Sequence, residues 1–369
     1  MEESVKSKRK LSFGRRLLIF FVGIFAFLGA LSMTMCALSP FVSPETFVWA
    51  SFFGLTFWPI LIFNLLILIA LMLLKSRKTL LISLFAIIIA VPGFKKSYSV
   101  NHKYTEEGNV KVLSYNVKHF QDINNNRRKA DEVKNDIAEI ILQQNADVVC
   151  VQESGLWNEK KIADFASKID CKYYATTKKY SGNVMFSKFP VEDDEFTEDF
   201  NKEHYSTGFI KLIKGGEKGN FYLECAHLKS FMISGEEIEY LNNASQYVEN
   251  SETMGKSLII KLKEGFKGRV EDSRMIIRNL PYNDIPIVIC GDFNDTPLSY
   301  TYHNMRSAEL RDAFTEVGKG VGKTYCGRLP LLRIDYFWIS DGVIPMTFDV
   351  VKRKLSDHYP IVMTFDVRR

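Results

Sequence analysis

The sequence predicts an α/β chain in two parts, with transmembrane helices in residues 1–96 and a layered α/β domain of sheets flanked by helices in residues 110–369. Long uncharged apolar runs are confined to the first part, and β-rich runs alternate with helical spacing in the second. The charge divides at the same boundary, because residues 1–96 hold 11 Lys or Arg against 3 acids and the remainder has a net charge of about −3. The basic pI of the chain therefore does not predict a nucleic-acid-binding surface on the domain.

Three apolar runs predict a multi-pass membrane anchor. The first, residues 17–38, has no charge over 22 residues and can cross a hydrocarbon core about 30 Å thick. The second covers residues 46–74, and the third, residues 79–94, is shorter and is interrupted near its end by Pro92 and Gly93. A cleaved signal peptide is the alternative for the first run, but the second run follows within ten residues, which favours a span. Two spans with a re-entrant third segment are the alternative to three.

The short loops predict the orientation of this anchor in the cell membrane. KSKRKLSFGRR precedes the first run and KSRK separates the second from the third, whereas SPFVSPE after the first run has no Lys or Arg. By the positive-inside rule the N-terminus is cytoplasmic. Three spans then place the domain outside the cytoplasmic membrane, and two spans would leave it inside.

Residues 97–109, SYSVNHKYTEEGN, predict a linker between anchor and domain. Of the five cysteines that follow, Cys150, Cys225 and Cys290 lie in apolar strand-like runs, where a free thiol acts as a small hydrophobe. An odd number argues against a complete disulfide framework, and no CxxC pair or Cys/His cluster indicates zinc. Cysteine usage therefore does not decide the compartment.

The domain is predicted to begin with a β-α-β unit. VKVLSYNV, from Val110, and ADVVCVQE, residues 146–153, are β-rich, and apolar residues recur at helical spacing over residues 133–141. A long helix is expected around residues 236–279. Further strands are expected in GNVMFSKFP, NFYLECAHL, IPIVICGDF, RIDYFWIS, PMTFDVV and YPIVMTFDV.

Polar side chains occur where most of these apolar runs stop. They are Asn116, Glu153, His227, Asp292, Asn294, Asp335 and the adjacent pair Asp357 and His358. One such residue alone is usually a cap or a turn residue. Together, acids, amides and histidines at successive strand ends indicate one cleft that holds a divalent cation and a phosphate.

Six short motifs resemble, in their order along the chain, the motifs of the endonuclease/exonuclease/phosphatase family: SYNV, VVCVQE, CAHL, ICGDFND, RIDYF and SDHYP. The resemblance covers about residues 110–369. Known members include deoxyribonucleases, apurinic-site endonucleases, inositol-polyphosphate phosphatases and neutral sphingomyelinases, all of them phosphoesterases on a four-layer α/β sandwich. The resemblance therefore implies this fold, with two packed mixed sheets, and a metal-dependent phosphoesterase.

The resemblance also implies a metal site. Glu153 is similar to the principal Mg²⁺ ligand of the family, and Mn²⁺ is the alternative ion. Asn116 would contact the metal or its water. Asp357 would reach the metal directly or through water.

Five further residues resemble the catalytic residues of the family. Asp292 and Asn294 are similar to the pair that orients or deprotonates the attacking water and binds the phosphoryl oxygens. His227 and His358 would donate hydrogen bonds to phosphate oxygens, and Asp335 would hold His358 in the required tautomer. Either Asp292 or His358 can be the general base.

One position departs from the pattern of nuclease-like members. Some of them carry an acid two residues after the first-motif Asn, where this chain has Lys118. A second metal is not expected there, and Lys118 is either a phosphate contact or a solvated lysine. His119 is expected to be a surface residue.

The resemblance predicts a membrane-anchored phosphoesterase that hydrolyses a phosphodiester of nucleic acid or of a lipid head group, or a phosphomonoester such as an inositol phosphate. Its expected partners are this substrate and the lipid bilayer, without an obligate protein partner. The alternative is an inactive, membrane-tethered binding or scaffold protein of the same fold. Glu153, Asp292, Asn294 and His358 are all present, which argues against that alternative.

Overall fold

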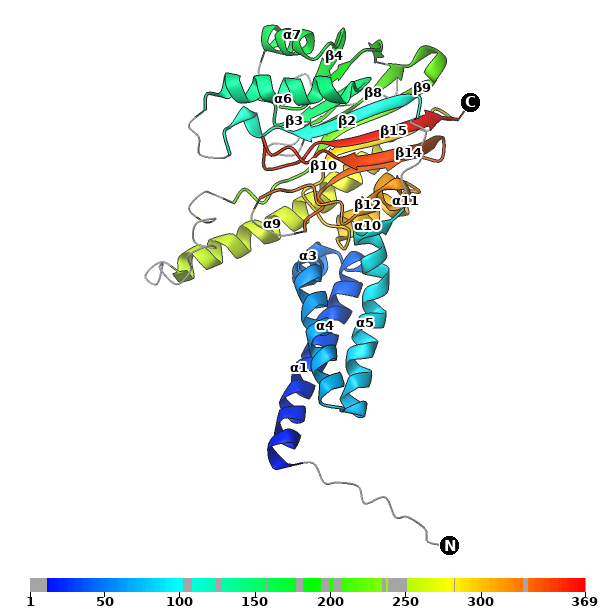
Figure 1. The fold of residues 1–369 in the computed structure, drawn as a ribbon. Helices are drawn as coiled ribbons and strands as arrows, with labels where there is room; N and C mark the ends of the chain where they lie inside the picture. Colours follow the sequence, from blue (N-terminus) through cyan, green and yellow to red (C-terminus); the bar gives the residue numbers. More distant parts are fainter. Residues whose placement is uncertain are drawn as a thin grey trace.

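The computed structural model shows a bundle of long helices that stands beneath a larger α/β domain (Figure 1). It describes residues 12–101, 108–123, 128–156, 158–176, 182–193, 199–201, 207–233, 237, 251–281, 283–327 and 331–368.

Three helices of the bundle lie side by side: α1 (Phe13–Leu38), α4 (Phe57–Leu73) and α5 (Arg77–Ser97). α1 and α5 run toward the domain and α4 runs away from it (Figure 1). By length and composition, the segments Phe13–Phe41 and Arg77–Ser97 can each cross a membrane. A third span results if the bent pair Trp49–Leu55 and Phe57–Leu73 counts as one. The described residues therefore offer two or three candidate spans.

The apolar run 46–74 is not one straight helix. α2 (Pro44–Phe47) and α3 (Trp49–Leu55) precede α4, and α3 meets α4 at a bend of 70°. Pro59 lies in the first turn of α4 and has no N–H for a helical hydrogen bond, so α3 cannot continue smoothly into α4. As a result α3 turns aside at the domain end of the bundle (Figure 1).

α5 extends beyond the third apolar run at both ends. The helix continues through Pro92 to Ser97, so the Pro-Gly pair does not interrupt it. Lys95 and Lys96 lie in its last turn, where a positive charge complements the carboxyl end of the helix dipole.

One sheet of the domain has six strands in the order β14-β15-β2-β3-β5-β4. Its strands are β2 (Val110–Asn116), β3 (Val148–Gln152), β4 (Tyr173–Thr176), β5 (Val184–Ser187), β14 (Val343–Val350) and β15 (Ile361–Val367). β2 and β3 are parallel, and the other neighbours are antiparallel. α6 (Ala130–Gln144) connects the parallel strands and, with α7 (Glu159–Lys168), covers the outer face of the sheet (Figure 1).

The other sheet has the strand order β11-β13-β10-β9-β8-β6, and β7 also pairs with β8. Its strands are β6 (Val191–Glu192), β7 (Asp199–Asn201), β8 (Thr207–Lys214), β9 (Asn220–His227), β10 (Ile287–Asp292), β11 (Arg311–Asp312) and β13 (Asp335–Ile339). β9 and β10 are parallel. α9 (Ser251–Arg278) and α10 (Tyr300–Ser307) lie on the outer face of this sheet.

The two sheets pack face to face across an apolar core that includes Val112, Cys150, Phe209, Val288 and Phe337. A second core lies between the six-stranded sheet and its helices, and a third lies between the other sheet and its helices. Burial of apolar surface on both faces of each sheet is the main stabilising term of such an arrangement. The domain is therefore a four-layer α/β sandwich, as predicted.

The predicted strands are confirmed at their expected positions. The long helix expected around 236–279 is present as α9, and residues 236 and 238–250 of that prediction lie outside the described residues. The described residues also form short helical elements: α11 (Ala313–Val317), η1 (Ser39–Phe41), η2 (Lys118–Phe120) and η3 (Gly216–Lys218). All six cysteines are buried and free.

The helical bundle and the domain are joined by more than the polypeptide chain. β1 (Ser99–Val100), in the segment expected as a linker, pairs antiparallel with β12 (Lys319–Gly320) of the domain. Arg333 donates to the carbonyl of Lys96 at 2.9 Å and forms a buried ion pair with Asp312 at 2.7 Å. The end of α5 is thus bonded directly to the domain.

Leu298 of the domain is buried among the helices of the bundle. It belongs to the same apolar cluster as Phe57, and a Cβ on Gly93 would come within 2.9 Å of its side chain. The hydroxyl of Ser39 donates a hydrogen bond to the Leu298 carbonyl. Because Leu298 is only four residues from Asn294, the loop after β10 is held by the helical bundle.

Candidate active site

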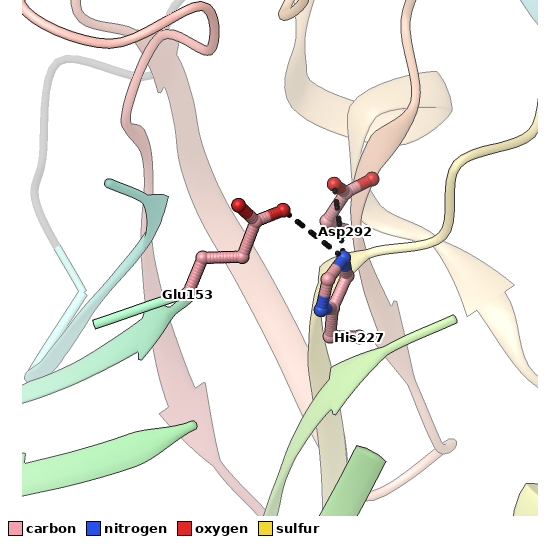
Figure 2. A group of neighbouring side chains, drawn as sticks. All are labelled: Glu153, His227 and Asp292. Atoms are coloured by element: carbon pink, nitrogen blue, oxygen red, sulfur yellow. Dashed lines mark ion pairs between the residues drawn. The ribbon is translucent and has the colours of Figure 1, made fainter. Parts of the chain in front are cut away.

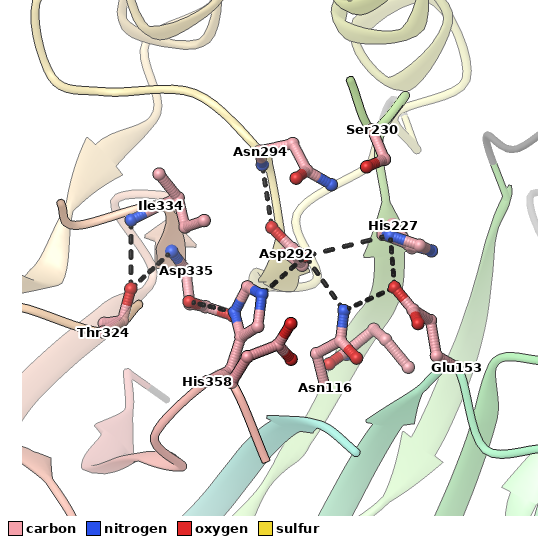
Figure 3. Close-up of polar contacts among 12 residues, drawn as sticks. Asn116, Glu153, His227, Ser230, Asp292, Asn294, Thr324, Ile334, Asp335 and His358 are labelled. Carbon is pink, nitrogen blue, oxygen red and sulfur yellow. Dashed lines mark hydrogen bonds and ion pairs between the residues drawn. The ribbon is translucent and has the colours of Figure 1, made fainter. Parts of the chain in front are cut away.

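Four strand ends from the two sheets meet at one site. Asn116 is the last residue of β2 and Glu153 directly follows β3, so both come from parallel strands of one sheet. His227 ends β9 and Asp292 ends β10, and these two residues are paired in register in the other sheet. Because the carboxyl ends of parallel strands lie at the same edge of a sheet, the four side chains converge between the sheets (Figure 3).

The side chain of Asn116 joins the two acids. Its Nδ2 donates to Glu153 Oε1 at 2.9 Å and to Asp292 Oδ2 at 3.0 Å (Figure 3). Its Oδ1 accepts a hydrogen bond from the backbone N–H of Lys118 at 3.0 Å. The buried amide therefore holds together two carboxylates that come from different sheets.

His227 completes a group of three potential metal ligands with Glu153 and Asp292 (Figure 2). Its Nε2 lies 3.5 Å from Glu153 Oε1 and 3.8 Å from Asp292 Oδ2. This nitrogen is buried and has no hydrogen-bond partner among the described residues. One ligand atom from each residue lies within 4.8 Å of the others. The two carboxylates can hold a divalent cation, and the unsatisfied imidazole nitrogen can meet either this cation or an oxygen of a phosphate beside it.

Asp292 also contacts the second histidine of the site. Its Oδ2 lies 3.5 Å from His358 Nε2, and its Oδ1 accepts from the backbone N–H of Asn294 at 2.8 Å. Burial raises the pKa of Asp292 to about 6, against the opposing effect of the positive charge on His358. This carboxyl group can therefore exchange a proton near neutral pH.

Asp335 fixes the ring of His358. Asp335 and Asp292 are paired in register across β13 and β10, so their carboxylates lie on either side of the imidazole (Figure 3). His358 Nδ1 lies 3.1 Å from Oδ1 and 2.9 Å from Oδ2 of Asp335. Burial lowers the pKa of His358, but the two carboxylates outweigh it and hold this pKa well above its ordinary value. The two carboxylates therefore favour the protonated form of the ring.

Asp357 is paired with Lys118, and not with the Glu153 group. Lys118 Nζ lies 2.6 Å from Asp357 Oδ2. Burial raises the pKa of Asp357, but the positive charges of His358 and Lys118 outweigh it and lower this pKa. The carboxylate that the sequence predicted as a metal ligand is thus ionised, and in this structure its counter-charge is a lysine.

Left-handed backbone conformations are concentrated at the site. The angle φ is 50° at Glu153, 52° at Asn294, and 46°, 53° and 57° at Lys118, His119 and Phe120. Each such non-glycine residue costs on the order of 1 kcal/mol, and strain of this kind clusters at functional sites. The turn also brings His119, expected as a surface residue, to the rim of the site. Its ring is 42% exposed, and its Nε2 is 3.7 Å from Glu153 Oε2.

The structure adds residues that the strand-end pattern did not indicate. Thr324 Oγ1 accepts from the backbone N–H groups of Ile334 and Asp335 at 3.0 and 3.2 Å, and the Tyr325 ring packs edge-on against His358. Neither residue follows a predicted strand, so no sequence signal could have found them. Their contacts hold the histidine and its carboxylate partner in place.

The loop after β10 contains one further charged residue. Asp295, directly after Asn294, forms a buried ion pair with Arg269 of α9, with Nε and Oδ2 3.1 Å apart. Asn294 Nδ2 donates to the carbonyl of Leu228, next to His227, at 3.1 Å. The GDFND run could have drawn attention to Asp295, but its partner is distant in the sequence.

Seven of the sequence-predicted residues thus form one network of hydrogen bonds and close ion pairs (Figure 3). They are Asn116, Glu153, His227, Asp292, Asn294, Asp335 and His358. Asp357 directly precedes His358 in the sequence, and the positive charge of His358 helps to lower the pKa of Asp357.

Comparison with known protein families gives two matches. The model of the Endonuclease/Exonuclease/phosphatase family matches residues 113–358, which is more than half of the chain. A second model, described as a domain of unknown function (DUF8431), matches residues 15–97. A comparison with curated proteins found no match.

Solved structures resemble the domain in fold. An endonuclease/exonuclease/phosphatase from Beutenbergia cavernae DSM 12333 has a TM-score of 0.50 at 15% identity, over 71% of this chain and 72% of that chain. One from Bacteroides vulgatus has a TM-score of 0.50 at 17% identity, over 70% and 99%. A family protein from Bacteroides thetaiotaomicron has a TM-score of 0.50 at 14% identity, over 70% and 98%. At these identities the likeness bears on the fold alone.

Proposed function

Because the chain belongs to the endonuclease/exonuclease/phosphatase family, whose members hydrolyse phosphoesters, we propose that it is a membrane-anchored, divalent-metal-dependent phosphodiesterase or phosphatase. The observation that carries this proposal is the Asn116-centred network, which brings a possible metal ligand, Glu153, and a possible base, Asp292, within hydrogen-bond reach of one amide. Two histidines flank these acids, so ring nitrogens as well as carboxylates face the position proposed for a phosphoryl group.

The proposed metal ion is Mg²⁺, with Mn²⁺ as the alternative. Glu153 would be its principal ligand, because a hard carboxylate suits a hard cation. Asn116 and, once released by Lys118, Asp357 would complete the set. When bound, such a cation supplies positive charge that stabilises the phosphoryl oxygens.

Asp292, His358 and Asp335 are the residues proposed to handle protons at the site. Asp335 holds the Nδ1–H of His358, so the opposite Nε2–H of the same ring is available as a donor to a phosphoryl oxygen. Two neighbouring carboxylates favour the protonated form of this ring, which has no free lone pair to accept a proton from water. Asp292 is therefore the proposed general base for the attacking water, and Asn294 and His227 would position the phosphate.

We also propose that the domain lies outside the cytoplasmic membrane. The opposed directions of α1, α4 and α5 support three crossings, and an odd number of crossings separates the N-terminus from the domain (Figure 1). A near-neutral domain on a membrane tether favours a membrane-delivered phosphoester over a long duplex nucleic acid.

A substrate panel tests this function. Purified full-length protein in detergent is assayed against DNA, RNA, sphingomyelin and inositol phosphates, with Mg²⁺, with Mn²⁺ and with EDTA. At least one substrate should be hydrolysed, and EDTA should abolish the activity. Metal binding by the wild type without turnover of any phosphoester class would instead favour a scaffold protein.

A further inference from the structure

α9 is longer than the sheet that it covers. Its 28 residues extend over about 42 Å, and the half that begins at Ser251 projects beyond the domain and beyond α3 (Figure 1). Phe266, Val270 and Ile276 in the other half are buried. In the projecting half, the side chains of Ile259 and Ile260 are 38% and 54% exposed. Adjacent isoleucines exposed beside lysines form an amphipathic surface that nothing in the described domain covers.

The exposed residues continue the face of α9 that meets the anchor. Lys263 Nζ lies 4.3 Å from the centre of the Trp49 ring in α3, and the rings of Phe266 and Phe52 are 5.3 Å apart. Ile260 is three residues before Lys263, so the two lie on the same face of the helix. The projecting half therefore extends this contact face outward from the bundle.

A second contact fixes the other end of the same face. Arg274 of α9 forms a two-bond ion pair with Glu45 of α2, at 3.0 and 2.8 Å. Together, the contacts of Lys263, Phe266 and Arg274 align α9 along α2 and α3 at the domain end of the bundle. Figure 1 shows that the projecting half descends to the level of α3.

The residues around α2 and α3 have the composition of a membrane interface. Phe41, Phe47 and Trp49 are 61%, 48% and 44% exposed, and all three lie at the domain end of the candidate spans. Aromatic side chains collect at the level of lipid head groups, and lysines extend from an apolar helix face toward phosphates. Exposed aromatic side chains at this level are typical of the lipid head-group region.

We propose that the face of α9 that bears Ile259, Ile260 and Lys263, which we call the head-group face, rests on the lipid leaflet that α2 and α3 border. Its partner is the bilayer itself: the isoleucines enter the boundary between head groups and acyl chains, and Lys263 meets anionic phosphates. This inference rests on the proposed function, and it narrows the substrate to a phosphoester in the head group of a bilayer lipid.

The same helix carries the loops of the candidate active site. Arg269 forms the buried ion pair with Asp295 and donates from Nη1 to the carbonyl of Lys229 at 3.0 Å. Asp272 accepts from the backbone N–H of Lys229 at 2.9 Å. These loops follow Asn294 and His227 directly, and Arg269 is only about 14 Å along the helix from Ile260. A helix seated in the head groups therefore sets the height of the site above the leaflet.

The head-group face is tested by quenching. Full-length Ile260→Cys protein is labelled with bimane and placed in nanodiscs that contain doxyl-labelled phospholipid, and all native cysteines are buried. The matched control is Leu142→Cys, because Leu142 is 45% exposed and belongs to α6, which lies on the side of the domain away from the bundle (Figure 1). Strong quenching at 260 and little at 142 is the expected result. Equal, weak quenching at both positions overturns the head-group face.

The substrate assignment is tested by two substrates and two variants. Ile260→Glu should lower hydrolysis of the lipid phosphoester in vesicles by about threefold or more, since a charge opposes burial in the bilayer. It should leave hydrolysis of soluble bis(p-nitrophenyl) phosphate unchanged, and Leu142→Glu should change neither rate. An Ile260→Glu protein with wild-type activity on vesicles, or with equal losses on both substrates, refutes the assignment. A wild type that hydrolyses no phosphoester refutes the proposed function too, whereas the quenching result decides the head-group face independently.

Discussion

His358 and Asp335 form a buried pair in which Nδ1 lies 2.9 Å from Oδ2, although 23 positions separate them in the sequence. His358→Ala should lower kcat by roughly 10²–10⁴, because a positioned donor to the phosphoryl group is lost. The Mg²⁺ concentration for half activity should stay nearly unchanged. Asp335→Asn should reproduce part of the loss, since an amide holds the ring less firmly.

The measurement for this pair is kcat with a Mg²⁺ titration for each variant. Asp341→Asn is the matched control, because Asp341 lies just beyond the same strand and its side chain is 89% exposed. If His358→Ala hydrolyses a substrate of the wild type at a near-normal rate, the placement of the SDHYP motif in the active site is wrong.

Glu153→Gln should act on the metal requirement. A neutral amide oxygen is a poorer ligand than a carboxylate, so the Mg²⁺ concentration for half activity should rise by about tenfold or more. Isothermal titration with Mn²⁺ gives the same comparison without turnover. Glu139→Gln, on the exposed face of α6, serves as the control. If the metal affinity of the Glu153 variant is unchanged, Glu153 is not a ligand of the metal.

Lys118→Met should lower the Mg²⁺ requirement. The lysine is the partner of Asp357 at 2.6 Å, and its removal leaves this carboxylate available to a cation. A partly exposed ion pair is worth up to about 1 kcal/mol, which corresponds to about a fivefold change in half-activation concentration. Lys134→Met, which breaks the surface pair with Asp131, is the control. A higher Mg²⁺ requirement would show that Lys118 assists the metal site instead of competing with it.

Glu224 should make the stability of the protein depend on pH. Burial raises the pKa of this carboxyl from 4.5 to about 8. Between these values the native state keeps a proton that the unfolded state has lost, so stability falls as the pH rises, by about 1.4 kcal/mol per pH unit. Glu224→Gln should remove this dependence and be more stable than the wild type above pH 8. Melting temperatures of both proteins from pH 5.5 to 8.5 measure the difference, and parallel curves would contradict the prediction.

Reporter fusions should reveal the orientation of the anchor. A C-terminal alkaline phosphatase fusion should be active, and a C-terminal green fluorescent protein fusion exported by the same pathway should be dark, because the domain is proposed to lie outside. Fusions after Lys75, between α4 and α5, should give the opposite pattern. Bright fluorescence from the C-terminal fusion would indicate two spans and a cytoplasmic domain.

Strands and most of the site were readable from the sequence because their signals are local. Apolar runs bounded by Gly and Pro mark β2, β3, β9 and β10, and the residue at which each run stops is the one that enters the site. The order of six short motifs then indicated how the strands pack, which no single run could do.

What the sequence could not show depends on contacts between distant residues. Lys118 and Asp357 are 239 positions apart, and only the fold shows that they form an ion pair. Likewise, only the fold shows that Thr324 Oγ1 accepts a hydrogen bond from the backbone N–H of Asp335. The bend before α4 is different, because Pro59 was a local signal inside an otherwise uniform apolar run.

The position of Leu298 among the bundle helices holds the domain against the bundle. With β1 paired to β12 as well, the domain cannot move through solution on a flexible tether. The lipid substrate that we propose would therefore arrive by lateral diffusion, in a two-dimensional encounter. The rate should follow the mole fraction of substrate in the bilayer: dilution with inert lipid should slow hydrolysis, and dilution of the whole suspension with buffer should not.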